Sequence, residues 1–154
     1  MSVPQPSAPS TAPSLEAVAE ILVELGEPII FGDTRDGHRR MTPVLGGRLR
    51  GFAAEPSATG FSADILSGGG DRQLIRPDGT VEIDASYEAR TLSDEHIGIR
   101  ASGIRRLNDD TVYFRVALRF ETAAPALAWL QDALFIADGV RETEHVRHTV
   151  YRVG

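Results

Sequence analysis

Four residues combine a proton-transfer or charged side chain with a setting suited to acid–base catalysis. Asp71 ends the glycine-rich segment SGGGD, where a carboxylate is accessible and can act as a general base. Tyr87 can present its hydroxyl in a pocket while its ring packs. His38, beside two arginines, is the strongest histidine candidate for an acid or base. Arg115 can stabilise an anionic intermediate, so these four residues form the predicted catalytic set.

The segment SGGGD also has a structural interpretation. A phosphate-binding glycine loop leads from a strand into a helix, so that backbone N–H groups and the helix dipole meet the phosphate. Here a further strand is predicted to follow, so the glycines are interpreted as a tight turn or bulge at the rim of a barrel. The sequence also has no Gly-x-Ser-x-Gly segment of the kind that presents a nucleophilic serine.

Polar side chains follow one face of each of two predicted strands, namely Asp84, Ser86, Glu88 and Arg90, and Tyr113, Arg115, Arg119 and Glu121. The ordinary interpretation is a solvated outer surface. In the alternative these groups line a barrel mouth, where arginines hold a carboxylate or an enolate. Ser86, Arg90 and Arg119 are then predicted substrate-binding residues. Trp129, the single tryptophan, is predicted either to plug the core or to offer a substrate a stacking surface.

The composition excludes several chemistries. The chain has no cysteine, which removes thiolate nucleophiles, disulfides and iron–sulfur clusters. All 16 basic residues are arginine, and the chain has no lysine. Schiff-base and pyridoxal-phosphate enzymes need the lysine side-chain amine, so both classes are excluded. His145 and His148 point to opposite faces of a strand and do not chelate one metal. We therefore expect neither a cofactor nor a metal.

Charge and hydropathy limit the partners. The formal net charge of −6 argues against nucleic acid, whose binding rests on basic surface. No apolar run approaches the roughly 20 residues that span a membrane, and the first residues lack the regions of a secretory signal. We expect a cytoplasmic protein whose partner is a small organic ligand or substrate. A homodimer is expected from the sheet edges of so small a barrel.

The pattern of the chain predicts one folded unit. Residues 1–14 are rich in Pro, Ser and Ala and are predicted to form a disordered tail, so the domain covers residues 15–154. Residues 15–25 suit either an amphipathic helix or a strand, and the glutamates at four-residue spacing favour the helix slightly. Beyond them, short alternating runs between turn signals predict an all-β fold, with one short helix near residues 124–130.

Five stretches together resemble a bacterial family known as domain of unknown function 3237: GEPIIFGDTRDGHRRMTPVLGGRLRG, SGGGDRQLIRPDGT, IDASYEARTL, YFRVALRFET and AWLQDALFIADGVR. The resemblance runs from about Leu15 to Val153. It implies a single antiparallel β-barrel of roughly eight to ten strands. By that analogy Leu15–Leu25 is the first strand rather than a helix. The family has no broadly established activity, so the resemblance informs the fold more than the function.

Two positions depart from the pattern of that family. Arg72 follows the Gly-Gly-Gly-Asp turn where the family usually has Trp, and Ser86 precedes Tyr87 where the family usually has Arg. If both positions face the lumen, an aromatic residue has been exchanged and a positive charge moved. Arg72 and Ser86 are therefore predicted to contact the substrate and to change the ligand without changing the fold.

Two functions remain open from the sequence. The first is a cofactor-independent acid–base enzyme of the lyase, hydratase, isomerase or cyclase type, acting on a small aromatic or polyketide-like molecule. The second is a non-catalytic ligand-binding or accessory barrel. The enzyme requires a carboxylate, a second proton-transfer group and an arginine that converge on one cavity.

Overall fold

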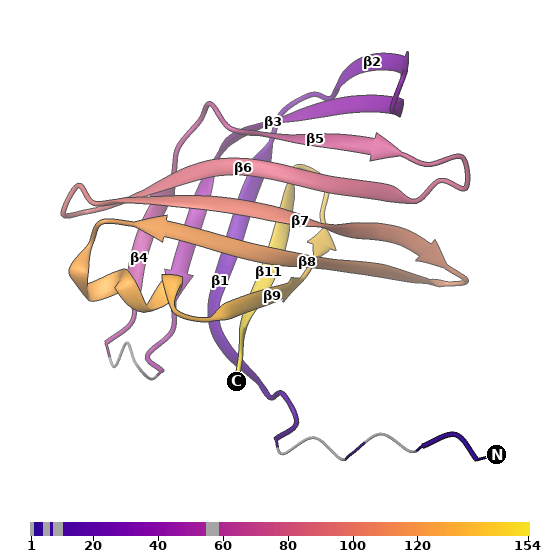
Figure 1. The fold of residues 1–154 in the computed structure, drawn as a ribbon. Coiled ribbons are helices and arrows are strands. Elements are labelled where there is room, and N and C mark those ends of the chain that lie inside the picture. Colours follow the sequence, from indigo (N-terminus) through magenta and orange to yellow (C-terminus); the bar gives the residue numbers. More distant parts are fainter. Residues whose placement is uncertain (1, 5–6, 8–10, 55–58) are drawn as a thin grey trace.

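A computed structural model of the chain describes residues 2–4, 7, 11–54 and 59–154 (Figure 1). The tail predicted for residues 1–14 lies partly outside the described residues. Across the described part, eleven strands and one 3₁₀ helix follow one another as β1 (Leu15–Leu25), β2 (Ile29–Thr34), β3 (Gly37–Gly51), β4 (Phe61–Ile65), β5 (Gly70–Ile75), β6 (Val81–Thr91), β7 (His96–Asn108), β8 (Thr111–Thr122), η1 (Pro125–Gln131), β9 (Leu134–Asp138), β10 (Val140–Arg141) and β11 (His145–Val153).

The strands form a closed antiparallel barrel, as predicted. Around it the order is β1, β11, β9, β8, β7, β6, β4 and β3, and pairing of β1 with β3 closes the ring. β5 takes the place of β4 farther along β3 and β6, and β10 pairs with β11. β2 pairs with β3 and projects beyond the ring with it (Figure 1). Closure leaves the strands of the ring with partners on both sides.

The first strand decides between the two predictions made for residues 15–25. They form β1, paired with β11 on one side and β3 on the other. The helix favoured by the glutamate spacing is therefore wrong, and the strand implied by the family resemblance is confirmed. The physical reason is the alternation: Ile21 and Val23 are buried in the barrel, whereas Glu20 and Glu24 are not.

Alternation also sets the interior elsewhere. On β6 the buried side chains include Ile83, Ala85 and Tyr87, and the residues between them face outward. The predicted short helix is confirmed as η1, which covers one end of the barrel (lower left in Figure 1). Its buried Leu127 and Leu130 join the core there. No helix of the described chain is long and apolar enough to span a bilayer.

Candidate functional site

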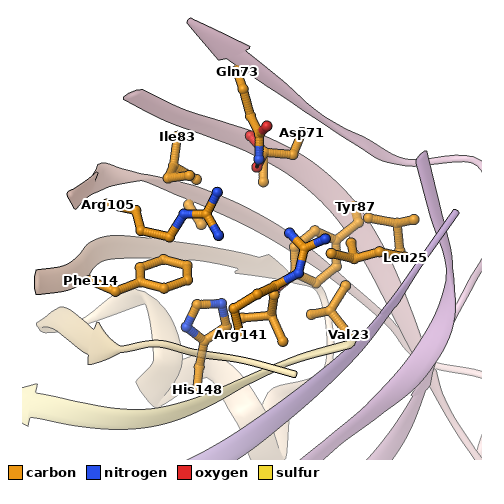
Figure 2. A pocket seen from close by; sticks show the side chains of 14 residues that line it. Val23, Leu25, Asp71, Gln73, Ile83, Tyr87, Arg105, Phe114, Arg141 and His148 are labelled. Carbon is orange, nitrogen blue, oxygen red and sulfur yellow. Dashed lines mark hydrogen bonds between the residues drawn. The ribbon is translucent and has the colours of Figure 1, made fainter. Parts of the chain in front are cut away.

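A cavity opens at the end of the barrel opposite η1, and Figure 2 shows the side chains that line it. Its space free of protein atoms is about 500 Å³ including the open mouth, and about 40 Å³ of this can hold the centre of a water molecule. The second volume exceeds the roughly 10–15 Å³ that a single water needs. The cavity is lined by Val23, Leu25, Val44, Asp71, Gln73, Ile83, Ala85, Tyr87, Ala101, Arg105, Phe114, Arg141, Val146 and His148. An apolar cavity with a few convergent polar groups is the usual form of a small-molecule site.

Asp71 is the carboxyl group of this cavity. β5 holds it with its side chain largely buried. Its Oδ1 accepts a 3.0 Å hydrogen bond from the backbone N–H of Asp84, and its Oδ2 accepts a 2.8 Å bond from Nε2 of Gln73. Burial raises the pKa of Asp71 above its ordinary value, and the two hydrogen bonds oppose this rise by favouring the ionised form. A carboxylate with a raised pKa is suited to proton transfer.

Gln73 connects that carboxyl to a cation. Its Oε1 accepts a 2.7 Å hydrogen bond from Nε of Arg40. Because an arginine nitrogen can only donate, the amide oxygen of Gln73 must face Arg40 and its NH₂ must face Asp71. Arg40 therefore orients Gln73, and Gln73 in turn orients the Asp71 carboxylate by donating a hydrogen bond to it. The remaining lone pairs of the carboxylate are available to a ligand.

Positive charge surrounds the carboxyl. Arg105 on β7 and Arg141 on β10 line the cavity, and Arg40 lies behind Gln73. Burial lowers the pKa of Arg105, and the nearby charges of Arg141 and Arg40 lower it further. Arg40 and Arg105 nevertheless keep their positive charge at physiological pH, because the pKa of an arginine lies far above it. The cavity can therefore stabilise an oxyanion that forms beside Asp71.

Tyr87 lies on the cavity wall with its ring 4% exposed. Its buried hydroxyl has no hydrogen-bond partner among the described residues. Burial raises the pKa of this hydroxyl, and the charge of Asp71 raises it further. Tyr87 therefore stays neutral and keeps a hydrogen-bond donor in the wall of the cavity.

The unpartnered hydroxyl predicts a gain of stability on its removal. An unsatisfied buried polar group costs roughly 1–3 kcal/mol, so Tyr87→Phe is expected to stabilise the protein by about 1 kcal/mol. This raises the melting temperature by roughly 2–4 °C for a domain of this size, measurable by thermal unfolding. Tyr113→Phe, at an exposed position of β8, is the matched control and should change little. A destabilised Tyr87→Phe variant would contradict the description of this hydroxyl as a buried group without a hydrogen-bond partner in the described residues.

His148 is the second proton-transfer group of the cavity. Its Nδ1 lies 2.6 Å from the carbonyl oxygen of Asp138, so the Nδ1–H donates there and Nε2 is left as an acceptor. The ring packs edge-on against Phe114, with 5.6 Å between the ring centres. Burial lowers the pKa of His148, which keeps the imidazole neutral near neutral pH.

The lowered pKa of His148 predicts a pH dependence of stability. An unfolded histidine titrates near pH 6.5, whereas folded His148 binds its proton only at lower pH. Its contribution is therefore complete above about pH 6.5 and is lost as the pH falls from there through the folded pKa. His148→Gln should flatten the fall of melting temperature between about pH 7.5 and pH 5. His96→Gln, at an exposed site, is the control; equal slopes for wild type and His148→Gln would refute the prediction.

The structure brings together two of the four predicted catalytic residues. Asp71 and Tyr87 line the same cavity. His38 lies outside it in the β2–β3 hairpin, where its Nδ1 is 3.0 Å from Oδ1 of Asp33. Arg115 points outward, with its guanidinium 5.6 Å from the centre of the Tyr113 ring. It faces out because its neighbour Phe114 faces in.

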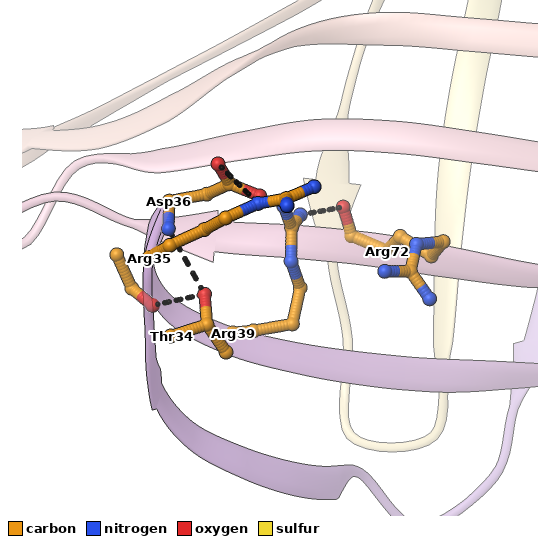
Figure 3. Close-up of polar contacts among 6 residues, drawn as sticks. Thr34, Arg35, Asp36, Arg39 and Arg72 are labelled. Carbon is orange, nitrogen blue, oxygen red and sulfur yellow. Dashed lines mark hydrogen bonds and ion pairs between the residues drawn. The ribbon is translucent and has the colours of Figure 1, made fainter.

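The predicted substrate-binding residues lie elsewhere. Arg72 is exposed near the β2–β3 hairpin, and its carbonyl oxygen accepts a 3.3 Å bond from Arg39 (Figure 3). Ser86 and Arg119 border a hollow on the outer wall, and Arg90 is exposed beside Asp94. Trp129 belongs to η1 and packs against Phe61 and Phe135 at the closed end of the barrel. The polar strand faces thus look outward, and the cavity draws its polar groups from the inner face.

Four residues of the cavity were not predicted from the sequence: Gln73, Arg105, Arg141 and His148. For two of them the strand alternation in the sequence carried a signal. Arg105 continues the inward alternation of Ile97, Ile99 and Ala101 on β7. His148 occupies the same inward register as Val146 and Val150. A charged or polar residue at an inward position of a barrel strand indicates an internal site. In the described part of the chain, no group of three or more His, Asp or Glu residues is arranged to hold a metal.

Comparison with known proteins identifies relatives over nearly the whole chain. The family model described as "Protein of unknown function (DUF3237)" matches residues 13–153. A UPF0311 protein of Rhodopseudomonas palustris is 31% identical over 157 residues, which cover 92% of this chain and 98% of that protein. The crystal structure of a conserved protein of unknown function from the same organism aligns with a TM-score of 0.81 and 27% identity, covering 94% of this chain and 99% of that one.

Two further similarities involve fungal proteins. PR-toxin biosynthesis cluster protein 7 of Penicillium roqueforti is 33% identical over 102 residues, or 61% of this chain and 55% of that protein. The crystal structure of an enzyme from Penicillium herquei aligns with a TM-score of 0.71 and 20% identity, covering 96% of this chain and 99% of that one. The second similarity concerns the fold alone.

Proposed function

The chain belongs to the DUF3237 family of proteins of unknown function, and from that premise we propose that it is an acid–base enzyme acting on a small organic molecule in the open end of its barrel. One observation carries the proposal: a buried carboxyl group, a second proton-transfer group and an arginine converge on one cavity, as Asp71, His148 and Arg105. Tyr87 adds a neutral hydrogen-bond donor.

The proposed reaction begins with proton transfer to Asp71. Its carboxylate takes a proton from an acidic O–H or C–H bond of the substrate, and the bonding electrons remain on the substrate as an oxyanion. Arg105 stabilises this charge, and the Tyr87 hydroxyl donates to it. Asp71 then returns the proton to another atom of the substrate, which gives an isomer or a closed ring, or to a leaving group, which gives an elimination.

The substrate class follows from the cavity walls and is supported by the fungal proteins. The walls include Phe114, Ile83, Val44 and Val146, which suit an apolar body such as an aromatic or polyketide-like ring. One relative carries the name of a toxin-biosynthesis cluster, and a protein of the same fold is described as an enzyme. Both support a role in the chemistry of small molecules.

A turnover screen tests the proposal. Purified protein is incubated with enolisable ketones, phenols and polyketide-like compounds, and loss of each compound and appearance of a product are followed by mass spectrometry. We expect at least one compound to be converted by wild type and by Arg115→Ala, whose side chain lies outside the cavity. Conversion should be lost with Asp71→Asn. Compounds that bind in the cavity and return unchanged would instead favour a non-catalytic ligand-binding barrel.

A further inference from the structure

We infer that the cavity binds its ligand through an anionic oxygen, a carboxylate or an enolate, held between Arg105 and Arg141 at the mouth. The inference deepens the proposed function and rests on it, because it names the ligand class of the same site. It assigns these two arginines a role that neither the sequence pattern nor the comparisons gave them.

The charge around the cavity favours an anionic ligand. The chain carries a formal net charge of −6, yet three guanidinium groups, those of Arg40, Arg105 and Arg141, lie around the one carboxyl group that lines the cavity, that of Asp71. Mutual repulsion of such cations opposes folding. Asp71 offsets at most one of the three charges. A bound anion relieves the remaining repulsion, so the arrangement favours an anionic ligand over a neutral one.

Arg105 and Arg141 are not held in ion pairs within the described part of the chain. Within the described residues, neither Arg105 nor Arg141 has a carboxylate oxygen within 4.0 Å. Glu142, next to Arg141, is instead engaged by His145 and Arg147. The guanidinium group of Arg105 lies over the Phe114 ring, 5.9 Å from the centre of the ring. Both donor groups are therefore available to a ligand.

Arg141 also borders a second, outer groove that has a different character. Glu24, Glu27 and Glu144 line that groove together with Arg141 and His145. Its acidic walls repel an anion, whereas the cavity side of Arg141 faces Arg105 and the apolar wall. An anionic ligand therefore has one favourable direction of entry, into the barrel.

Arg105 and Arg141 reach the cavity from two different strands. Arg105 comes from β7 and Arg141 from β10, and in Figure 2 both guanidinium groups project into the space below Asp71 and Gln73. An oxyanion held there directs the rest of the molecule toward the apolar wall, and the buried Tyr87 hydroxyl without a partner supplies one further donor. The two arginines thus orient the ligand so that its reactive atom meets the Asp71 carboxyl group.

Calorimetric titration with defined probes tests the inference. The probes are benzoate as a carboxylate, acetylacetonate as an enolate at a pH above the pKa of acetylacetone, and benzamide as the neutral counterpart of benzoate. We expect at least one anion to bind at least about tenfold more tightly than benzamide, because hydrogen bonds to charged groups are the stronger ones. Arg105→Gln and Arg141→Gln should each weaken anion binding about tenfold and leave benzamide unchanged. Arg106→Gln, exposed on the same strand as Arg105, is the control.

Several results would overturn the inference. Benzamide binding as tightly as the anions would remove the role of charge, and unchanged anion binding in both cavity variants would remove the role of these arginines. Failure of both anions to bind at millimolar concentration would do the same. Thermal unfolding checks that each variant is folded. The protein could prefer neutral substrates and still lose its turnover with Asp71→Asn. That result would contradict the inference of an anionic ligand and would support the proposed enzyme.

Discussion

Asp71→Asn is expected to lower kcat for a substrate found in the screen by roughly 100- to 10,000-fold, the usual contribution of a positioned general base. The amide nitrogen of Asn cannot accept a proton. It would also set an NH₂ group against either the NH₂ of Gln73 or the backbone N–H of Asp84, because both present donors to Asp71. The effect is measured as the steady-state turnover of Asp71→Asn, compared with wild type and with the control variant Arg115→Ala. A variant within about threefold of wild type would remove Asp71 from the mechanism.

The pH profile gives an independent readout of the same residue. A general base works in its ionised form, so kcat/KM should rise with pH through the pKa of Asp71, which burial places above its ordinary value. Gln73→Leu removes a hydrogen bond that favours the ionised form, and this should shift the acidic limb to higher pH. An acidic limb at the same pH in both proteins would show that another group controls it.

Period-two alternation, which is set by the side chains themselves, was sufficient to predict an all-β fold, and the family resemblance added the barrel. On β6 and β8 the residues between the predicted polar faces are buried, from Ile83 to Tyr87 and from Phe114 to Phe120. β1 was harder, since glutamates at four-residue spacing fit both periods. Only the pairing of β1 with two distant strands resolves it, and pairing between residues that lie far apart in sequence is not written in the local pattern.

The candidate site could be predicted only in part. Asp71 and Tyr87 carried local signals, a glycine-flanked carboxylate and a polar tip on an apolar face. Arg141 had none, because it lies on a two-residue strand that reaches the mouth only through its pairing with β11. The predictions for His38 and Arg115 rested on residue type alone. His38 lies in the β2–β3 hairpin and Arg115 at an outward position of β8, so both are outside the cavity. The residue type indicates which chemistry a side chain can perform. Whether the side chain reaches the cavity depends on its inward or outward position in the strand and on the strand pairing that closes the barrel.

Gly69→Ala is expected to have the largest effect on stability among the substitutions considered, although the residue carries no chemistry. A Cβ atom there would lie 2.5 Å from the carbonyl oxygen of Ser86 and 2.5 Å from Cβ of Tyr87. These are positions in the middle of a paired strand that cannot yield easily. The carbonyl oxygen of Gly69 also accepts a 2.9 Å hydrogen bond from the N–H of Val44. Relief of the clash must therefore move the start of β5 away from β6.

That displacement links the glycine segment to the site. Overpacking of this kind costs roughly 1–3 kcal/mol, which lowers the melting temperature by about 2–12 °C in a domain of this size. Ser67→Ala, exposed in the same loop, is the control and should change little. Because Asp71 lies two residues beyond Gly69 and Tyr87 is what the new methyl group meets, turnover should fall even at temperatures where the variant is folded. A Gly69→Ala variant as stable and as active as Ser67→Ala would show that β5 and β6 are held apart by something other than this contact.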